Sequence, residues 1–147
     1  MPCRIIGCGN TDRGDDAAGL LVAQRLRDFG VDACDHIGDG LSLIERWRGQ
    51  DEVILIDAVI TGGTAGAITV WDAGQAAILH DFPQSSTHGF GVCEAVKLSR
   101  VLDCMPERML IYGIEGQCFE AGCNPLPEVL TACEQLARHL AARNGVV

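Results

Sequence analysis

The chain has 147 residues, a length that favours one domain with a single hydrophobic core over residues 1–147. Its formal net charge of −9 argues against nucleic acid or an anionic membrane as partner, because both would repel it. No apolar run reaches the roughly 20 residues that span a bilayer, and the first residues lack a signal-peptide pattern. We therefore expect a cytoplasmic protein without a membrane segment.

Eight cysteines are spread along the chain without a Cys-x-x-Cys pair, so zinc-ribbon and thioredoxin-type sites are not predicted. Cys3, Cys8 and Cys133 lie in apolar periodic segments, where cysteine usually acts as a small hydrophobe. We expect reduced thiols throughout, with Cys118 and Cys123 in a loop as the most reactive.

Apolar runs and helical stripes alternate along the chain. Strands are predicted at 3–8, 31–37, 53–56, 67–71 and 108–114, the third of them stopping at Asp57. Helices are predicted at about 16–29, 41–47, 73–79, 88–102 and from Pro125 or Pro127 to about Arg143.

This alternation predicts a three-layer α/β sandwich around a mostly parallel sheet. The link at 61–66 contains three glycines and is too short for a crossover helix. The strand that follows it must therefore pair antiparallel or lie at an edge of the sheet.

The first strand leads into a glycine- and acid-rich turn, which in α/β proteins is where ligands usually bind. A dinucleotide site needs a third glycine where this chain has Asp12. Asp15 and Asp16 would also repel a phosphate at the helix start. The turn therefore suits a cation, or its acids simply cap the helix.

Three ionisable residues, Asp16, Asp57 and His88, follow strands or open helices. If the first and third strands are neighbours, these side chains meet in one crevice and form a ligand set for Ni²⁺ or Zn²⁺ with open positions. Each also has a structural alternative: Asp16 as a helix cap, Asp57 as a turn cap, His88 as a cap or surface residue.

Asp39 lies between two glycines after the second strand, on the same predicted edge. It could act as a general base, or belong to an ordinary Gly-Asp-Gly turn. Cys93 lies five residues after His88, a poor helical spacing for a Cys–His pair, and we expect it in the core.

These motifs resemble the hydrogenase maturation proteases, the endopeptidases that trim the large subunit of [NiFe] hydrogenases. The matching segments occur in the family's order over nearly the whole chain. They are Gly7-x-Gly9-Asn10, Gly14-Asp15-Asp16, Gly19, Ile54-Leu55-Ile56-Asp57-Ala58, Ser86-Thr87-His88-Gly89 and Tyr112-Gly113-Ile114-Glu115.

The resemblance implies a phosphorylase/hydrolase-like fold, with helices on both faces of a five-stranded mixed sheet of order 2-1-3-5-4 and strand 4 antiparallel. It implies that Asp16, Asp57 and His88 bind the nickel of the substrate's own active site, so nickel is a recognition element rather than a resident cofactor. Another divalent metal could bind there adventitiously. The implied activity is removal of a short C-terminal extension from the nickel-loaded large-subunit precursor.

Two positions depart from the family pattern. Ala17 stands where a glycine often follows the two acids, and Gly38-Asp39-Gly40 replaces an Asp-Gly-Gly turn. We expect Asp16 and Asp39 to be catalytic and the protein to be a monomer. The alternative is a non-catalytic nickel- or metal-binding accessory protein on the same fold.

Overall fold

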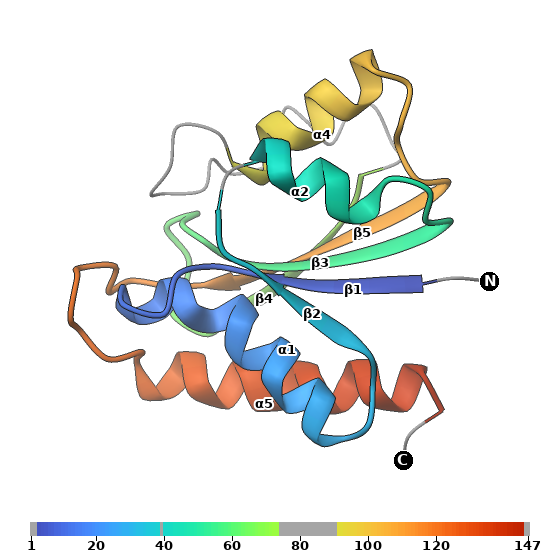
Figure 1. The fold of residues 1–147 in the computed structure, drawn as a ribbon. Helices are drawn as coiled ribbons and strands as arrows, with labels where there is room; N and C mark the ends of the chain where they lie inside the picture. The colour runs from blue at the N-terminus through green and yellow to red at the C-terminus, as the bar shows by residue number, and fades with distance from the viewer. Residues whose placement is uncertain (1–2, 39, 74–90, 146–147) are drawn as a thin grey trace.

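The computed structural model describes residues 3–38, 40–73 and 91–145, and Figure 1 shows how their helices and strands are arranged. The strands are β1 (Cys3–Cys8), β2 (Ala33–His36), β3 (Glu52–Val59), β4 (Ile68–Asp72) and β5 (Arg108–Glu115). The helices are the 3₁₀ turn η1 (Gly14–Ala17), α1 (Ala18–Asp28), α2 (Gly40–Trp47), α4 (Val92–Val101) and α5 (Pro127–Arg143).

The five strands form one sheet of order β2-β1-β3-β5-β4. The pairs β1–β2, β1–β3 and β3–β5 are parallel, and β4 is antiparallel to β5. The predicted order and the antiparallel fourth strand are both confirmed. Helices α1 and α5 cover one face of the sheet while α2 and α4 cover the other (Figure 1).

Each face of the sheet has its own hydrophobic cluster, and β3 contributes to both. Ile54 and Ile56 pack with α1 and α5, whereas Val53 and Leu55 pack with α2 and α4. A strand segment that is buried on both faces needs apolar side chains at successive positions. Residues 53–56 of β3 are therefore all apolar.

Two glycines allow α1 to lie directly on the strands. A Cβ at Gly19 would lie 2.3 Å from the carbonyl oxygens of Cys8 and Ile56, and one at Gly7 would lie 2.1 Å from the Gly19 oxygen. Any larger residue would push the helix away. The close contact holds the turn before α1 against the carboxyl ends of β1 and β3.

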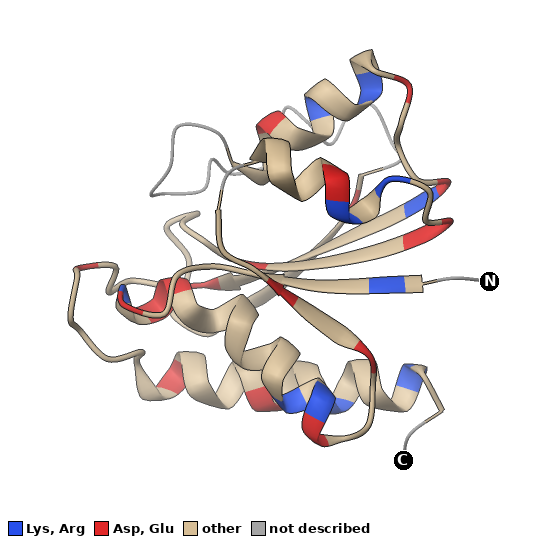
Figure 2. Ribbon diagram, viewed as in Figure 1, with Lys and Arg blue, Asp and Glu red and all other residues tan. Residues whose placement is uncertain are grey.

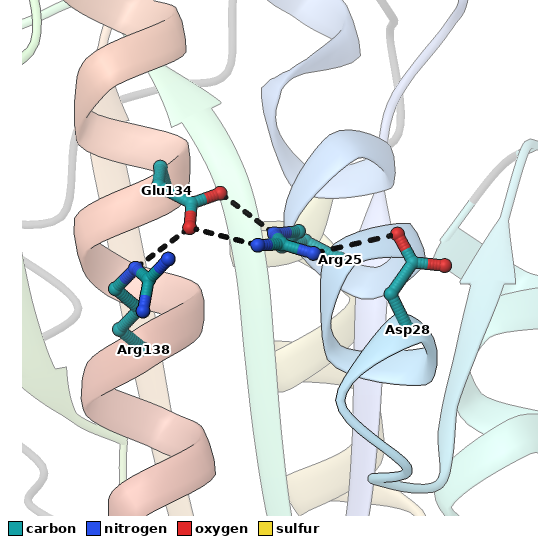
Figure 3. A network of polar contacts seen from close by, with 4 residues as sticks. All are labelled: Arg25, Asp28, Glu134 and Arg138. Atoms are coloured by element: carbon teal, nitrogen blue, oxygen red, sulfur yellow. Dashed lines mark hydrogen bonds and ion pairs between the residues drawn. The ribbon is translucent and has the colours of Figure 1, made fainter.

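The outer surfaces of α1 and α5 are joined by a charged network (Figure 3). Arg25 Nε donates to Glu134 Oε1 at 2.8 Å, and Arg138 Nε lies 2.7 Å from the other oxygen of the same carboxylate. Asp28 contacts Arg25 at 3.9 Å from within α1. This network is exposed, so it fixes the relative position of the two helices more than it stabilises the fold.

The structure differs from the sequence predictions at several element ends. The first helix is preceded by η1 instead of beginning near residue 16, and β3 continues past Asp57 to Val59, where it pairs with β5. Leu102, the last residue of the helix predicted at 88–102, follows the end of α4 and is 52% exposed. The predicted helix at 73–79 falls largely outside the described residues, as does the loop at 80–87.

Candidate functional site

The candidate site lies at the carboxyl ends of β1 and β3. The two strands pair as far as Gly7 and Ile56, after which β1 separates from β3 while β3 continues beside β5. Asp57 is the first residue of β3 beyond that pairing. Asp57 therefore lies at the point where β1 and β3 separate.

Asp16 lies on η1, in the turn that α1 holds against these strand ends. Its backbone oxygen accepts from Asn10 N at 3.2 Å, and a Cβ at Gly9 would lie 2.1 Å from that same oxygen. Gly9 has a φ of 154°. The glycine therefore permits the close approach that brings Asp16 beside the end of β1.

Neither structural alternative for the two acids matches the geometry. No side-chain capping hydrogen bond is formed at the start of η1 or of α1, so Asp16 is not their cap. Asp57 accepts from Ala58 N at 2.9 Å inside a strand rather than capping a turn. Both residues are buried, with 6% and 7% of their surface exposed.

The two buried acids act on one another electrostatically. Burial raises the pKa of Asp57 well above its ordinary value, the negative charge of Asp16 raises it further, and the Ala58 amide opposes both. A buried pair of like charges is stable when it shares a proton or holds a cation. Either a shared proton or a bound cation would therefore stabilise this pair.

A histidine that the sequence analysis did not single out lies on the same edge. His36 ends β2 in register with Cys8, is 4% exposed, and accepts from Arg46 Nε at 2.9 Å through Nδ1. An accepting Nδ1 leaves the ring proton on Nε2. Its position at the end of a predicted strand could have identified His36 as a site residue. The weak alternation of that strand left the strand end poorly defined in the sequence.

Asp15 has a different role from Asp16, although the two are adjacent and both were expected to face a ligand or cap the helix. Its carboxylate accepts from the amides of Gln117, Cys118 and Leu126 at 2.8–2.9 Å, and its side chain is fully buried. Asp15 therefore fixes the segment between β5 and α5 rather than facing a ligand.

The expectation of reduced thiols is wrong for one pair. Cys118 and Cys123 form a disulfide within the segment that Asp15 holds. The six other cysteines are free, and Cys93 is buried among α2 and α4 residues as expected. A pairing across five residues depends on how the loop folds back, which residue spacing alone does not reveal.

The structure brings Asp16 and Asp57 together, whereas Asp39 and His88 lie outside the described residues. Within residues 3–38, 40–73 and 91–145, no three His, Cys, Asp or Glu side chains are grouped so as to hold a metal ion. None of the helices in those ranges is long and apolar enough to cross a membrane.

Comparison with known proteins gives a consistent result. The family model described as hydrogenase maturation protease, HycI, matches residues 23–142, a stretch that includes Asp39, Asp57 and His88 and begins after Asp16. No curated protein is similar enough to count as a relative.

Solved structures match over almost the whole chain. The hydrogenase maturating endopeptidase HybD from Escherichia coli has a TM-score of 0.81 at 19% identity, with 97% of this chain and 91% of that one covered. The [NiFe] hydrogenase maturation protease HybD from Thermococcus kodakarensis has a TM-score of 0.77 at 24% identity, covering 97% and 98%. The protease HycI from Thermococcus kodakarensis has a TM-score of 0.76 at 24% identity, covering 96% and 90%. These structures share the fold described above.

Proposed function

The chain belongs to the hydrogenase maturation protease family, and from that premise we propose that it cleaves a short C-terminal extension from a nickel-loaded hydrogenase precursor. The precursor is the large subunit of a [NiFe] hydrogenase. The observation that carries this proposal is the buried pair of Asp16 and Asp57 where β1 leaves β3.

Nickel enters the proposal as part of the substrate. Asp16 and Asp57 supply two carboxylates, and His88 supplies an imidazole in the ligand set that the family resemblance implies. Three protein ligands leave positions for the substrate and solvent to complete the metal's shell. The free protein would then bind nickel modestly, and a precursor that lacks nickel would be a poor substrate.

The electrostatics of the acid pair suit this role. Asp57 holds its proton more strongly than an ordinary aspartate because it is buried beside Asp16. A divalent cation would displace that proton and neutralise both carboxylates. Binding of the precursor's nickel would thereby position the adjoining peptide at the carboxyl end of the sheet.

The proposed reaction is peptide hydrolysis. Water adds its oxygen to the scissile carbonyl carbon, and the leaving amine takes up a proton as the C–N bond breaks. A carboxylate beside the attacking water accepts the water proton and returns it to the amine. We assign this role to Asp16 and Asp39, the acids expected nearest to the bound peptide.

The partner is the precursor itself, bound in a transient complex by a monomeric protease in the cytoplasm. In Figure 2 the acidic residues are red, and several of them lie in the turn between β1 and α1, at the candidate site. With a net charge of −9, the protein would attract a basic tail on the precursor. Complementary charge chiefly raises the association rate.

The test is incubation of the purified protein with a nickel-loaded large-subunit precursor, followed by intact-mass measurement. We expect a loss of mass at the precursor C-terminus. Asp57→Ala should abolish it, whereas Asp12→Ala, an exposed acid of the β1–α1 turn, should not. Nickel binding with no mass loss would instead support a non-catalytic accessory protein.

A further inference from the structure

A hollow of about 270 Å³ opens beside the candidate site. It is lined by Ile60, Gly62 and Gly63 on one side, and by residues 115–117 with Phe119 on the other. Its volume lies just below the roughly 300 Å³ at which small-molecule pockets begin. The hollow is therefore of a size for one side chain rather than for a cofactor.

The acidic residue of this hollow is Glu115, which is buried, with 4% of its surface exposed. It accepts from Thr61 N at 2.8 Å and from Thr61 Oγ1 at 2.5 Å. A carboxylate has about four acceptor positions, so Thr61 leaves others unused. Across the described ranges of the chain, no lysine or arginine forms an ion pair with Glu115.

The wall of the hollow is open next to that carboxylate. Gly63 has no side chain, and a Cβ there would lie 3.5 Å from Glu115 Oε1. The opposite wall is held in place, because Gln117 N donates to Asp15 Oδ2 at 2.8 Å. The hollow is thus a preformed recess with a buried acid.

The hollow adjoins the acid pair through two elements. On β3 and β5, Asp57 is in register with Gly113 and Val59 with Glu115, so Glu115 lies about 7 Å farther along the strand direction. On the β1–α1 turn, Asp15 fixes the wall of the hollow while Asp16, the next residue, belongs to the acid pair. A peptide bound at the acid pair would reach the hollow within one or two residues.

We propose that this hollow is a substrate subsite in which Glu115 binds an arginine side chain of the polypeptide being cleaved. This proposal rests on the proposed protease function. Glu115 is a specificity residue under this proposal, and it touches the substrate away from the bond that is broken.

The chemistry of the hollow favours a guanidinium over other groups. Thr61 donates two hydrogen bonds to the Glu115 carboxylate, and a cationic donor at a remaining acceptor position would add a charge-assisted hydrogen bond. The planar guanidinium donates in parallel to a carboxylate and stacks on aromatic rings, and Phe119 offers such a ring in the wall. A neutral donor would form only an ordinary, weaker hydrogen bond with this carboxylate.

The experiment is a titration of the ¹⁵N-labelled wild-type protein with N-acetyl-arginine amide, followed by amide chemical shifts. N-acetyl-citrulline amide, which has the same shape without the charge, is the matched probe. We expect the arginine probe to shift the amides of Thr61, Gly63 and Gln117, with citrulline at least about tenfold weaker. Equal shifts with both probes, or none with either, would overturn the proposal.

Two variants assign the effect to Glu115. Glu115→Gln should weaken binding of the arginine probe about tenfold, as expected for loss of one charge-assisted hydrogen bond. Glu120→Gln removes the same charge from an exposed position of the same loop and should bind like wild type. Unchanged binding to Glu115→Gln would contradict the assignment. The comparison of probes on the wild type does not depend on either variant folding.

The outcome is separable from that of the proposed function. Cleavage of a precursor without arginine-probe binding would reject the subsite alone. Arginine-probe binding without cleavage of any nickel-loaded precursor would reject the protease function while leaving Glu115 as a cation-binding residue.

Discussion

Asp15 and Cys118 exchange two hydrogen bonds across a sequence separation of 103 residues. Asp15 N donates to the Cys118 carbonyl at 2.8 Å, and Cys118 N donates back to Asp15 Oδ2 at 2.9 Å. The turn after β1 and the segment after β5 are thereby joined into one rigid unit beside the candidate site.

We predict that Asp15→Asn destabilises the protein by about 3 kcal/mol. The side-chain nitrogen of asparagine cannot accept a hydrogen bond, so at least one of the three part-buried backbone amides loses its partner. Urea unfolding measures the change. Asp12→Asn, an exposed change in the same turn, should stay within about 0.5 kcal/mol of wild type. A similar small effect for Asp15→Asn would contradict the structural role given to this residue.

We predict that Asp57→Asn makes the metal-free protein more stable at neutral pH. The folded-state pKa of Asp57 is raised by burial and by Asp16. Its contribution to stability is therefore fully present below its unfolded pKa near ~3.9, and is lost as pH rises through the folded value. The free energy of unfolding of wild type should fall across that range more than that of Asp57→Asn. Urea unfolding at several pH values, with the exposed Asp32→Asn as control, tests the sign.

Nickel binding should depend on Asp16, Asp57 and His88 together. Calorimetric titration of Ni²⁺ or Cd²⁺ into wild type should show one modest site that each alanine variant loses. Affinity should decrease as pH drops through ~6.5, because an imidazole must be neutral to coordinate. If a folded alanine variant binds the metal with wild-type affinity, the substituted residue is not a metal ligand.

Alkylation of the cysteines should depend on reduction. Without reductant, Cys118 and Cys123 are joined and should remain unlabelled. Burial raises the pKa of Cys133 to about 12 and that of Cys3 to about 11, so little thiolate exists at either residue and both should react slowly. After reduction, Cys118 and Cys123 should label ahead of these two. Peptide mass spectrometry reads each site, and labelling of Cys118 before reduction would favour the free thiols expected from the sequence.

Association with the precursor should slow as salt is added. The attraction between an acidic protease and a basic tail acts at long range and is screened over a Debye length of about 8–10 Å near physiological ionic strength. Stopped-flow or surface-based kinetics should show a falling association rate and a nearly constant dissociation rate. A rate insensitive to salt would rule out electrostatic attraction as a contributor.

Residue patterns in the sequence predicted the layers and the antiparallel or edge position of the fourth strand, and the resemblance to the family implied the strand order. Residues 53–56 of β3 are apolar at every position because both faces of that segment are buried, and the short link before β4 leaves no room for a crossover helix. Only glycine fits at positions 7 and 19, because a Cβ there would collide with neighbouring backbone atoms. Gly7 and Gly19 are part of the motif that marks the turn in the sequence. These features are local, so residue type and spacing are enough to predict them.

Only the tertiary structure decided what each polar side chain contacts. It separated Asp15, which holds amides of residues 117, 118 and 126, from Asp16, whose charge raises the pKa of Asp57. It also placed Asp57 inside β3, paired Cys118 with Cys123, and put Glu115 in a hollow. Hydrogen bonds and charge repulsion depend on groups that are distant in the sequence, and no periodicity within one segment specifies where those partners lie.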